Sequence, residues 1–235
     1  MMLEDVMNRL KSLGSEQTVK TFRRHGAPEN MYGVKVADLK VILKQLKGRQ
    51  ELVQSLWDTG NSDARYLASL LGDGKLMSTK QLNDWAKTAD WYMLSEYAVP
   101  FVAAEHPDAT KLAMKWIDSK SPNIQSSGWS TYSLVVMTRD DEVLDLEQIR
   151  ELLTRCETSI HQQANRVRYV MNGFVTSVGA GIKELFPETL RIAKAIGKIR
   201  VEMGETACKV PDAVESLTKI ESMKRIGKKK SSTKC

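Results

Sequence analysis

The sequence predicts an all-α protein built as an α-α superhelix, that is, a solenoid of antiparallel helix pairs. Apolar residues recur three or four positions apart in almost every segment, which is the period of a helix with one buried face. The segments are about ten residues long, and helices this short need a packed partner. A run of such pairs is typical of HEAT-type repeats of about 40 residues. Because no strict residue repeat is visible, a compact irregular helical domain is the alternative.

The first half of the chain divides into six expected helices that end at glycine, proline or asparagine. Gly26 and Pro28 end the second helix, and Gly60 and Gly72 end the fourth and fifth, because these residues stop a helix or favour a turn. Ser78 is the expected N-cap of the sixth. The six helices lie at about 3–10, up to 25, 39–46, 52–57, 64–71 and 78–86. The outer side of the third helix carries Lys40, Lys44 and Lys47.

The stretch 91–100 organises the rest of the chain. As a helix it turns Trp91 toward a core and places Tyr92 and Glu96, four residues apart, together on another face. Pro100 cannot donate a hydrogen bond to the carbonyl of Glu96, so we expect the helix to bend there. An aromatic ring beside a carboxylate at a bend is a candidate site. The alternative is a solvated glutamate beside a half-buried tyrosine.

Six further helices are expected in the second half, at about 111–117, from 122 onward, and at 146–153, 164–178, 190–196 and 214–220. Pro122 stands at the first helical position of its segment. The helix at 164–178 has one apolar stripe, with Arg168 and Asn172 in line on the opposite side. An amide and a guanidinium on one line suit a phosphate backbone, and a surface salt bridge is the alternative. Residues 198–203 alternate like a strand, but one short strand cannot form a sheet, so an extended connection is expected.

Charge is distributed unevenly along the chain. The 235 residues carry 35 Lys and Arg against 29 Asp and Glu, a net charge of +6. Six of these bases and no acid lie in 224–235, so the remainder is neutral. Residues 161–200 hold seven bases and two acids, which fits either a directed electrostatic face or chance segregation of solvated charges. We expect one domain over residues 1–223 and a basic, disordered tail over 224–235.

The remaining composition restricts the class of protein. Three cysteines, far apart and odd in number, indicate reduced thiols in a cytoplasmic protein. The three histidines have no zinc-ligand spacing with them, so we predict no metal. No phosphate-binding or dinucleotide motif is complete, so we predict no cofactor. No apolar run reaches the 18 or so residues of a membrane span, and the acidic start is no signal peptide, so no membrane association is expected. We expect a monomer.

Three stretches, taken in order, resemble the AlkD-type DNA alkylation repair family. The first is an aromatic-Gly-Val-Lys entry into a helix at 32–40, the second is the Trp-Tyr…Val-Pro stretch at 91–100, and the third is the Lys-Trp-Ile-Asp motif at 115–118 followed by Asn123-Ile124. The resemblance is one of pattern and covers most of the chain. It implies a HEAT-like helical solenoid. The founding members are glycosylases that remove cationic N-alkylated purines from DNA.

The same resemblance implies a set of site residues. Anchored on Val99-Pro100, it places Trp91 and Tyr92 at aromatic positions that contact the lesion and its sugar, and Glu96 at the position of a catalytic aspartate. A DNA-gripping arginine of the family is absent from the helix at 125–129. A late tryptophan is replaced near Asn172, with Arg166 and Arg168 close by. Several branches of this family bind DNA without excising bases.

The implied chemistry needs no general acid, because an alkylated purine such as 3-methyladenine or 7-methylguanine is already a cationic leaving group. Glu96 would stabilise the charge that develops on the sugar or hold the attacking water. Trp91 and Tyr92 would stack on the cationic lesion. The partner would be double-stranded DNA, and the alternatives are a non-catalytic binder of damaged or branched DNA and a scaffold for another protein. Phosphate contacts are expected from Lys40, Lys44, Lys47, Arg166, Arg168 and Asn172.

Overall fold

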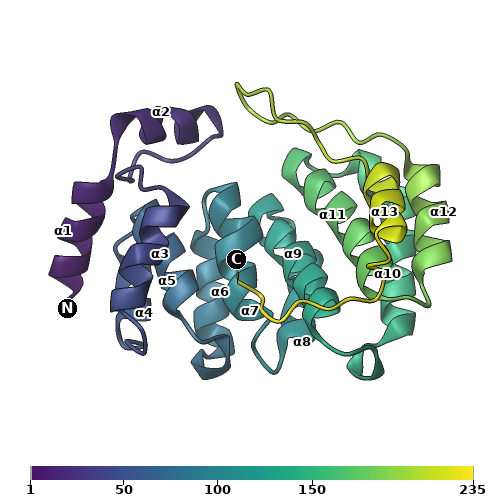
Figure 1. The fold of residues 1–235 in the computed structure, drawn as a ribbon, viewed down its shortest axis with the longest axis horizontal. Coiled ribbons are helices and arrows are strands. Elements are labelled where there is room, and N and C mark those ends of the chain that lie inside the picture. The colour runs from purple at the N-terminus through teal and green to yellow at the C-terminus, as the bar shows by residue number, and fades with distance from the viewer. Residues whose placement is uncertain (1, 235) are drawn as a thin grey trace.

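The protein is an α-α superhelix, seen in a computed structural model that describes residues 2–234 (Figure 1). Within those residues the chain forms thirteen α-helices and no β-strand. The second helix of each pair contacts the next along one continuous row, which we call the inner row. The inner row consists of α3 (Val36–Gln45), α5 (Ser62–Leu71), α7 (Val99–Ala103), α9 (Pro122–Thr138), α11 (Asn165–Gly181) and α13 (Ala213–Ser222).

The remaining helices cover the other side of the inner row or precede it. Each outer helix packs on the inner helix that follows it in the chain. The outer helices are α4 (Leu52–Asp58), α6 (Thr79–Thr88), α8 (Ala109–Ile117), α10 (Leu146–Ser159) and α12 (Phe186–Ile196). The first helix, α1 (Leu3–Leu13), packs on the start of both rows, and α2 (Glu16–Arg24) projects beyond the rows at one edge (Figure 1). This arrangement confirms the predicted fold class.

Two large apolar clusters and a small third one form the core, and α8 joins the two large ones. Leu112 and Trp116 belong to the N-terminal cluster, while Ala113 and Ile117 belong to the C-terminal one. Because α8 buries two faces, its neighbour α9 must approach it closely, and Gly128 of α9 permits that approach. A Cβ at Gly128 would lie 2.6 Å from the backbone nitrogen of Ile117, so only glycine allows this approach.

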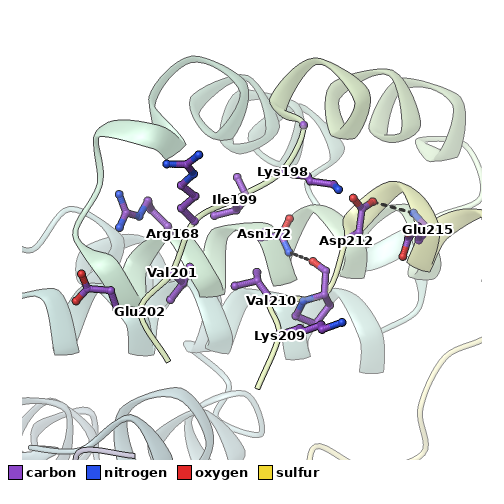
Figure 2. Close-up of a pocket in the computed structure, with 13 residues that line it drawn as sticks. Arg168, Asn172, Lys198, Ile199, Val201, Glu202, Lys209, Val210, Asp212 and Glu215 are labelled. Atoms are coloured by element: carbon purple, nitrogen blue, oxygen red, sulfur yellow. Dashed lines mark hydrogen bonds between the residues drawn. The ribbon is translucent and has the colours of Figure 1, made fainter. Parts of the chain in front are cut away.

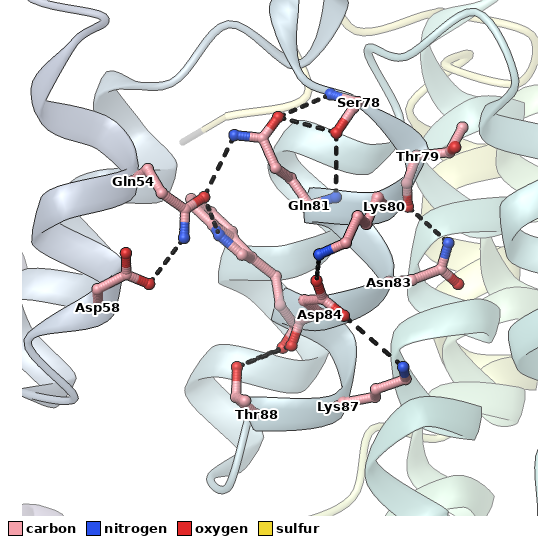
Figure 3. A network of polar contacts seen from close by, with 11 residues as sticks. Gln54, Asp58, Ser78, Thr79, Lys80, Gln81, Asn83, Asp84, Lys87 and Thr88 are labelled. Atoms are coloured by element: carbon pink, nitrogen blue, oxygen red, sulfur yellow. Dashed lines mark hydrogen bonds and ion pairs between the residues drawn. The ribbon is translucent and has the colours of Figure 1, made fainter.

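Helix ends agree closely with the sequence signals. The hydroxyl of Ser78 accepts a hydrogen bond from the backbone N–H of Gln81, as predicted for an N-cap. Gln81 also donates to Gln54 of α4, and this joins two neighbouring repeats through a surface network (Figure 3). Trp57 and Trp85 stack beside it with ring centroids 3.8 Å apart.

The stretch 91–100 is helical, and its middle is a π-helical turn, η2 (Leu94–Ala98), that continues into α7. The backbone N–H of Val99 donates to the carbonyl of Leu94, five residues back. Pro100 has no N–H with which to continue the normal ladder, and a π-turn before it is one way in which a helix absorbs that loss. The sequence predicted an irregularity at this position but not its form.

The structure corrects the expectation of a disordered tail for residues 224–234, the part of that tail that it describes. Residues 224–234 run across the inner row, and Thr233 is buried, with its hydroxyl donating 2.8 Å to the carbonyl of Phe101. Composition alone predicted disorder because lysine and serine bury little apolar area. The segment is instead held by polar contacts with the ends of helices, which composition does not reveal.

Two absences apply to residues 2–234. None of the helices there combines the length and the apolar character that crossing a bilayer requires. The same residues contain no cluster of three or more His, Cys, Asp or Glu side chains that could hold a metal ion.

Candidate nucleic-acid interface

Glu96 lies in η2 and turns its carboxylate inward, onto the protein. Its side chain is 2% exposed. A buried carboxylate needs partners that replace its water, because an unpaired charge in a protein interior is costly. The structure supplies them from α11, 70 residues further along the chain.

The partner of Glu96 is Arg166, in the first turn of α11. Its Nε donates to Oε1 of Glu96 at 2.7 Å, and its Nη2 donates to Oε2 at 2.5 Å. Two parallel charge-assisted hydrogen bonds of this kind are the strongest that arginine makes with a carboxylate. Both oxygens of Glu96 are therefore engaged by a cation.

Two tyrosine rings and a thioether complete the surroundings of Arg166. The guanidinium carbon lies 4.5 Å from the ring centre of Tyr92 and 4.3 Å from that of Tyr169. The third nitrogen, Nη1, contacts the sulfur of Met203 at 3.4 Å. The tyrosine faces stabilise the cation and hold its plane.

Burial and pairing act in opposite directions on the protonation of this cluster. Burial raises the pKa of Glu96, and the hydrogen bonds from Arg166 work against that rise. For Arg166, burial works to lower the pKa, but the pairing with Glu96 outweighs it and the pKa is raised. Burial also raises the pKa of Tyr92, so its phenol stays protonated at neutral pH.

Two cavities meet at this cluster. One, of about 420 Å³, is lined by Glu96, Tyr97, Tyr169 and residues of α9 and the C-terminal segment. The other, of about 530 Å³, is lined by Tyr92, Tyr97, Tyr169 and Arg166, with His25 and Cys208. Tyr97 and Tyr169 are shared by both. Cavities of this volume hold a ligand of the size of a nucleotide rather than a duplex.

An extended segment, residues 197–212, covers the second cavity. It links α12 to α13 and reaches across to the end of α2 (Figure 1). The N–H of Glu205 donates to the carbonyl of Arg24 at 3.0 Å. Gly204 has a φ of +74°, and a Cβ there would lie 2.1 Å from the carbonyl oxygen of Arg24. We call the contact between residues 203–205 and Arg24 the bridge.

Trp91 supports α2 and does not face the cavities. It is 6% exposed, its indole N–H donates to the carbonyl of His25 at 3.1 Å, and its ring packs on Phe22 at 5.3 Å between centroids. The structure therefore places Trp91 in a packing role where the resemblance implied contact with the lesion. The apolar stripe of its helix is the physical reason. Tyr92, by contrast, borders the cavity as expected.

Arg168 and Asn172 line a third cavity, of about 950 Å³, between α11 and the 197–212 segment (Figure 2). The amide of Asn172 donates to the carbonyl of Pro211 at 2.9 Å and the residue is 4% exposed, so this side chain anchors the segment where a phosphate contact was predicted. Arg168 contacts Asn165 through Nη2, and its Nε has no hydrogen-bond partner among the described residues. This Nε is buried, so it is an unpaired donor inside the protein and is not offered to a phosphate at the surface.

The three predicted lysines of the first repeats lie apart from this cluster. Lys40 and Lys44 are on α3 and Lys47 is in the turn after it, and the last two are exposed. None of the three lines the cavities beside Glu96 and Arg166. The structure thus brings Tyr92, Glu96 and Arg166 together and leaves these lysines on a separate surface.

Sequence reasoning missed Tyr97, Tyr169 and Met203 as parts of the site. Tyr169 stands three residues after Arg166 on the same helix, a spacing that puts the two side chains on one face and was a usable signal. Tyr97 follows Glu96 directly and enters the site because the π-turn changes the helical register. Met203 carries no local signal, because an extended segment brings it there.

Comparison with known proteins identifies the family. The protein-family model with the description "DNA alkylation repair enzyme" matches residues 6–184. The chain belongs to this family. Among the curated relatives of this chain are uncharacterized proteins of Listeria innocua and Listeria monocytogenes. Each is 33% identical over 216 residues, which cover 89% of this chain and 93% of the relative.

A solved structure extends the comparison to the whole fold. It represents "a new family of proteins related to the HEAT-like repeat DNA glycosylases with affinity for branched DNA structures". The TM-score is 0.91 and the identity is 33%, with all of both chains covered. The chain therefore has the HEAT-like repeat fold of that structure, and its Glu96–Arg166 pair joins the turn before α7 to α11.

Proposed function

We propose that this protein binds DNA at branched or distorted sites and does not excise bases while Glu96 is paired with Arg166. The pair is the observation that carries the proposal. A carboxylate that stabilises a cationic sugar, or holds an attacking water, must offer an oxygen to it. Both oxygens of Glu96 already accept hydrogen bonds from one guanidinium.

The cavity that Tyr92 and Arg166 line is covered by the 197–212 segment, and this favours branched DNA over a continuous duplex as the partner. The bridge stands over the cavity that contains Tyr92 and Arg166, so a duplex would have to displace it. An unpaired strand at a fork or junction can enter a space of about 530 Å³, and its bases can stack on tyrosine rings. The solved relative is described by its affinity for branched DNA, which points the same way.

A glycosylase is the second candidate, and one observation favours it. Glu96 lines the cavity of about 420 Å³ despite its pairing. A DNA phosphate that drew Arg166 away would leave the carboxylate beside Tyr92, ready to stabilise a cationic sugar. This route requires the pair to open when an alkylated duplex binds.

One set of measurements tests the proposal. The binding of a four-way junction, a splayed fork and a linear duplex of equal length is compared by fluorescence anisotropy at several salt concentrations. Release of 3-methyladenine and 7-methylguanine from alkylated duplex is measured beside it. We expect tighter binding to the junction and fork and no release of base. Equal affinity for all three DNAs would contradict the proposal.

Three variants assign the result to residues. Tyr92→Ala and Arg166→Gln should each weaken junction binding, whereas Lys111→Ala, on the outer helix α8, should not. Base release that is lost in Glu96→Gln would instead establish the glycosylase.

A further inference from the structure

The C-terminal segment, residues 224–234, crosses the C-terminal ends of four inner-row helices. The N–H of Gly227 donates to the carbonyl of Ala180 in α11 at 2.8 Å, and the N–H of Lys230 donates to Met137 in α9 at 2.7 Å. Thr233 donates to Phe101 in α7, and the ammonium of Lys234 donates to Gly72 at the end of α5. Figure 1 shows this yellow segment running from α13 across the molecule.

These contacts have a common physical basis. The last carbonyls of a helix have no partner within the helix, and they carry the negative end of its dipole. A basic extended segment donates hydrogen bonds to these carbonyls and also offsets their negative charge. The acids at this edge are also paired, because Lys229 contacts Asp141 at 2.6 Å and Lys234 contacts Glu105 at 3.2 Å.

Four basic side chains of the segment make no anchoring contact, and all four are exposed. They are Lys224, Arg225, Lys228 and Lys230, and none of these side chains forms an ion pair within residues 2–234. Lys230 also lines the same cavity of about 420 Å³ as Glu96 and Tyr169. The anchoring side chains thus turn toward the protein, while the four other cations are exposed along the segment and one of them, Lys230, borders the candidate site.

We propose that the anchored segment is a second phosphate-binding edge, which holds the sugar-phosphate backbone of one DNA arm while the cavity bordered by Tyr92 and Tyr97 receives a strand of another. The inference rests on the proposed function. A free tail would lose conformational entropy when it bound DNA, whereas a docked segment has its cations already in place. The ligand is the polyanionic backbone, so this edge contributes affinity and salt dependence without reading sequence.

The test compares three variants of the full chain with the unchanged protein on a four-way junction. The first replaces Lys224, Arg225, Lys228 and Lys230 by Ala. The second, the release variant, combines Lys229→Ala, Thr233→Val and Lys234→Ala, which removes the side-chain anchors while the four exposed cations remain. The control replaces Lys80, Lys87, Lys111 and Lys115 by Ala on the outer helices α6 and α8. Removing the four segment cations should reduce the slope of log affinity against log salt by about 2 to 4.

The outcomes separate the inference from the function. We expect the release variant to bind several-fold more weakly than the unchanged protein, and the outer-helix control to keep most of its slope. Tighter binding by either segment variant would overturn the inference and identify the segment as an internal inhibitor, and equal loss in variant and control would overturn it as non-specific charge. If the unchanged protein shows no preference for the junction, the proposed function itself fails.

Discussion

Arg166 holds Glu96 by two parallel hydrogen bonds of 2.7 and 2.5 Å, across 70 residues of sequence. The acid lies on a π-helical turn and the base in the first turn of α11, so the pair ties two repeats of the inner row together. It is also the feature that separates a site for binding DNA from a site for cleaving a glycosidic bond.

Breaking this pair from one side should be costly. We expect Arg166→Ala to lower the free energy of unfolding by about 3 kcal/mol, because it leaves the buried carboxylate without its partner. The double variant Glu96→Leu with Arg166→Met should recover most of this loss, since an apolar pair of similar volume needs no solvation. Urea unfolding measures both. Additive losses in the double variant would contradict this view of the pair.

The stability of the protein should depend on pH through Glu96. Burial raises its folded-state pKa above the ordinary value of 4.5, so the folded state binds the proton more tightly than the unfolded state. The unfolding free energy of the unchanged protein, relative to Glu96→Gln, should therefore fall as pH rises from 4.5 through the raised value. Urea unfolding of both proteins at pH values between about 4 and about 7, the range in which a raised carboxyl pKa affects stability, measures this difference. A difference that increases with pH would mean that Arg166 outweighs burial.

The bridge to α2 should depend on a single glycine. We expect Gly204→Ala to separate residues 203–205 from Arg24, because its Cβ would lie 2.1 Å from the carbonyl oxygen. Gly197→Ala is the matched control: its φ is also positive, but a Cβ there meets nothing within 4 Å. Hydrogen exchange at the amide of Glu205 should accelerate in the first variant and stay slow in the second. Equal exchange in both would show that the bridge does not depend on this close approach.

Two helical glycines should respond in opposite directions. Gly173→Ala on α11 should stabilise the protein by up to about 1 kcal/mol, because alanine favours a helix and nothing lies within 4 Å of its Cβ. Gly128→Ala should destabilise it by more than that, because the new methyl group meets the backbone of α8 at 2.6 Å. Thermal unfolding of the two variants provides the comparison. A stable Gly128→Ala variant would mean that α8 and α9 can move apart.

The sequence by itself determined the helices. Apolar residues at a period of 3.6, with breaks such as Gly60 and Gly72, set the helical segments and the fold class, because a short amphipathic helix is stable only when its stripe is covered. Local spacing also predicted that Tyr92 and Glu96 would share a face, and that Pro100 would disturb their helix.

Only the tertiary structure decided what those residues meet. The partner of Glu96, the burial of Trp91 under α2, the use of Asn172 to hold Pro211 and the docking of the basic C-terminal segment all join residues far apart in the chain. Periodicity reports which face of a helix is apolar, but it carries no information on which distant polar group will lie opposite. A charge buried by packing takes the partner that the fold brings to it, and for Glu96 that partner is Arg166.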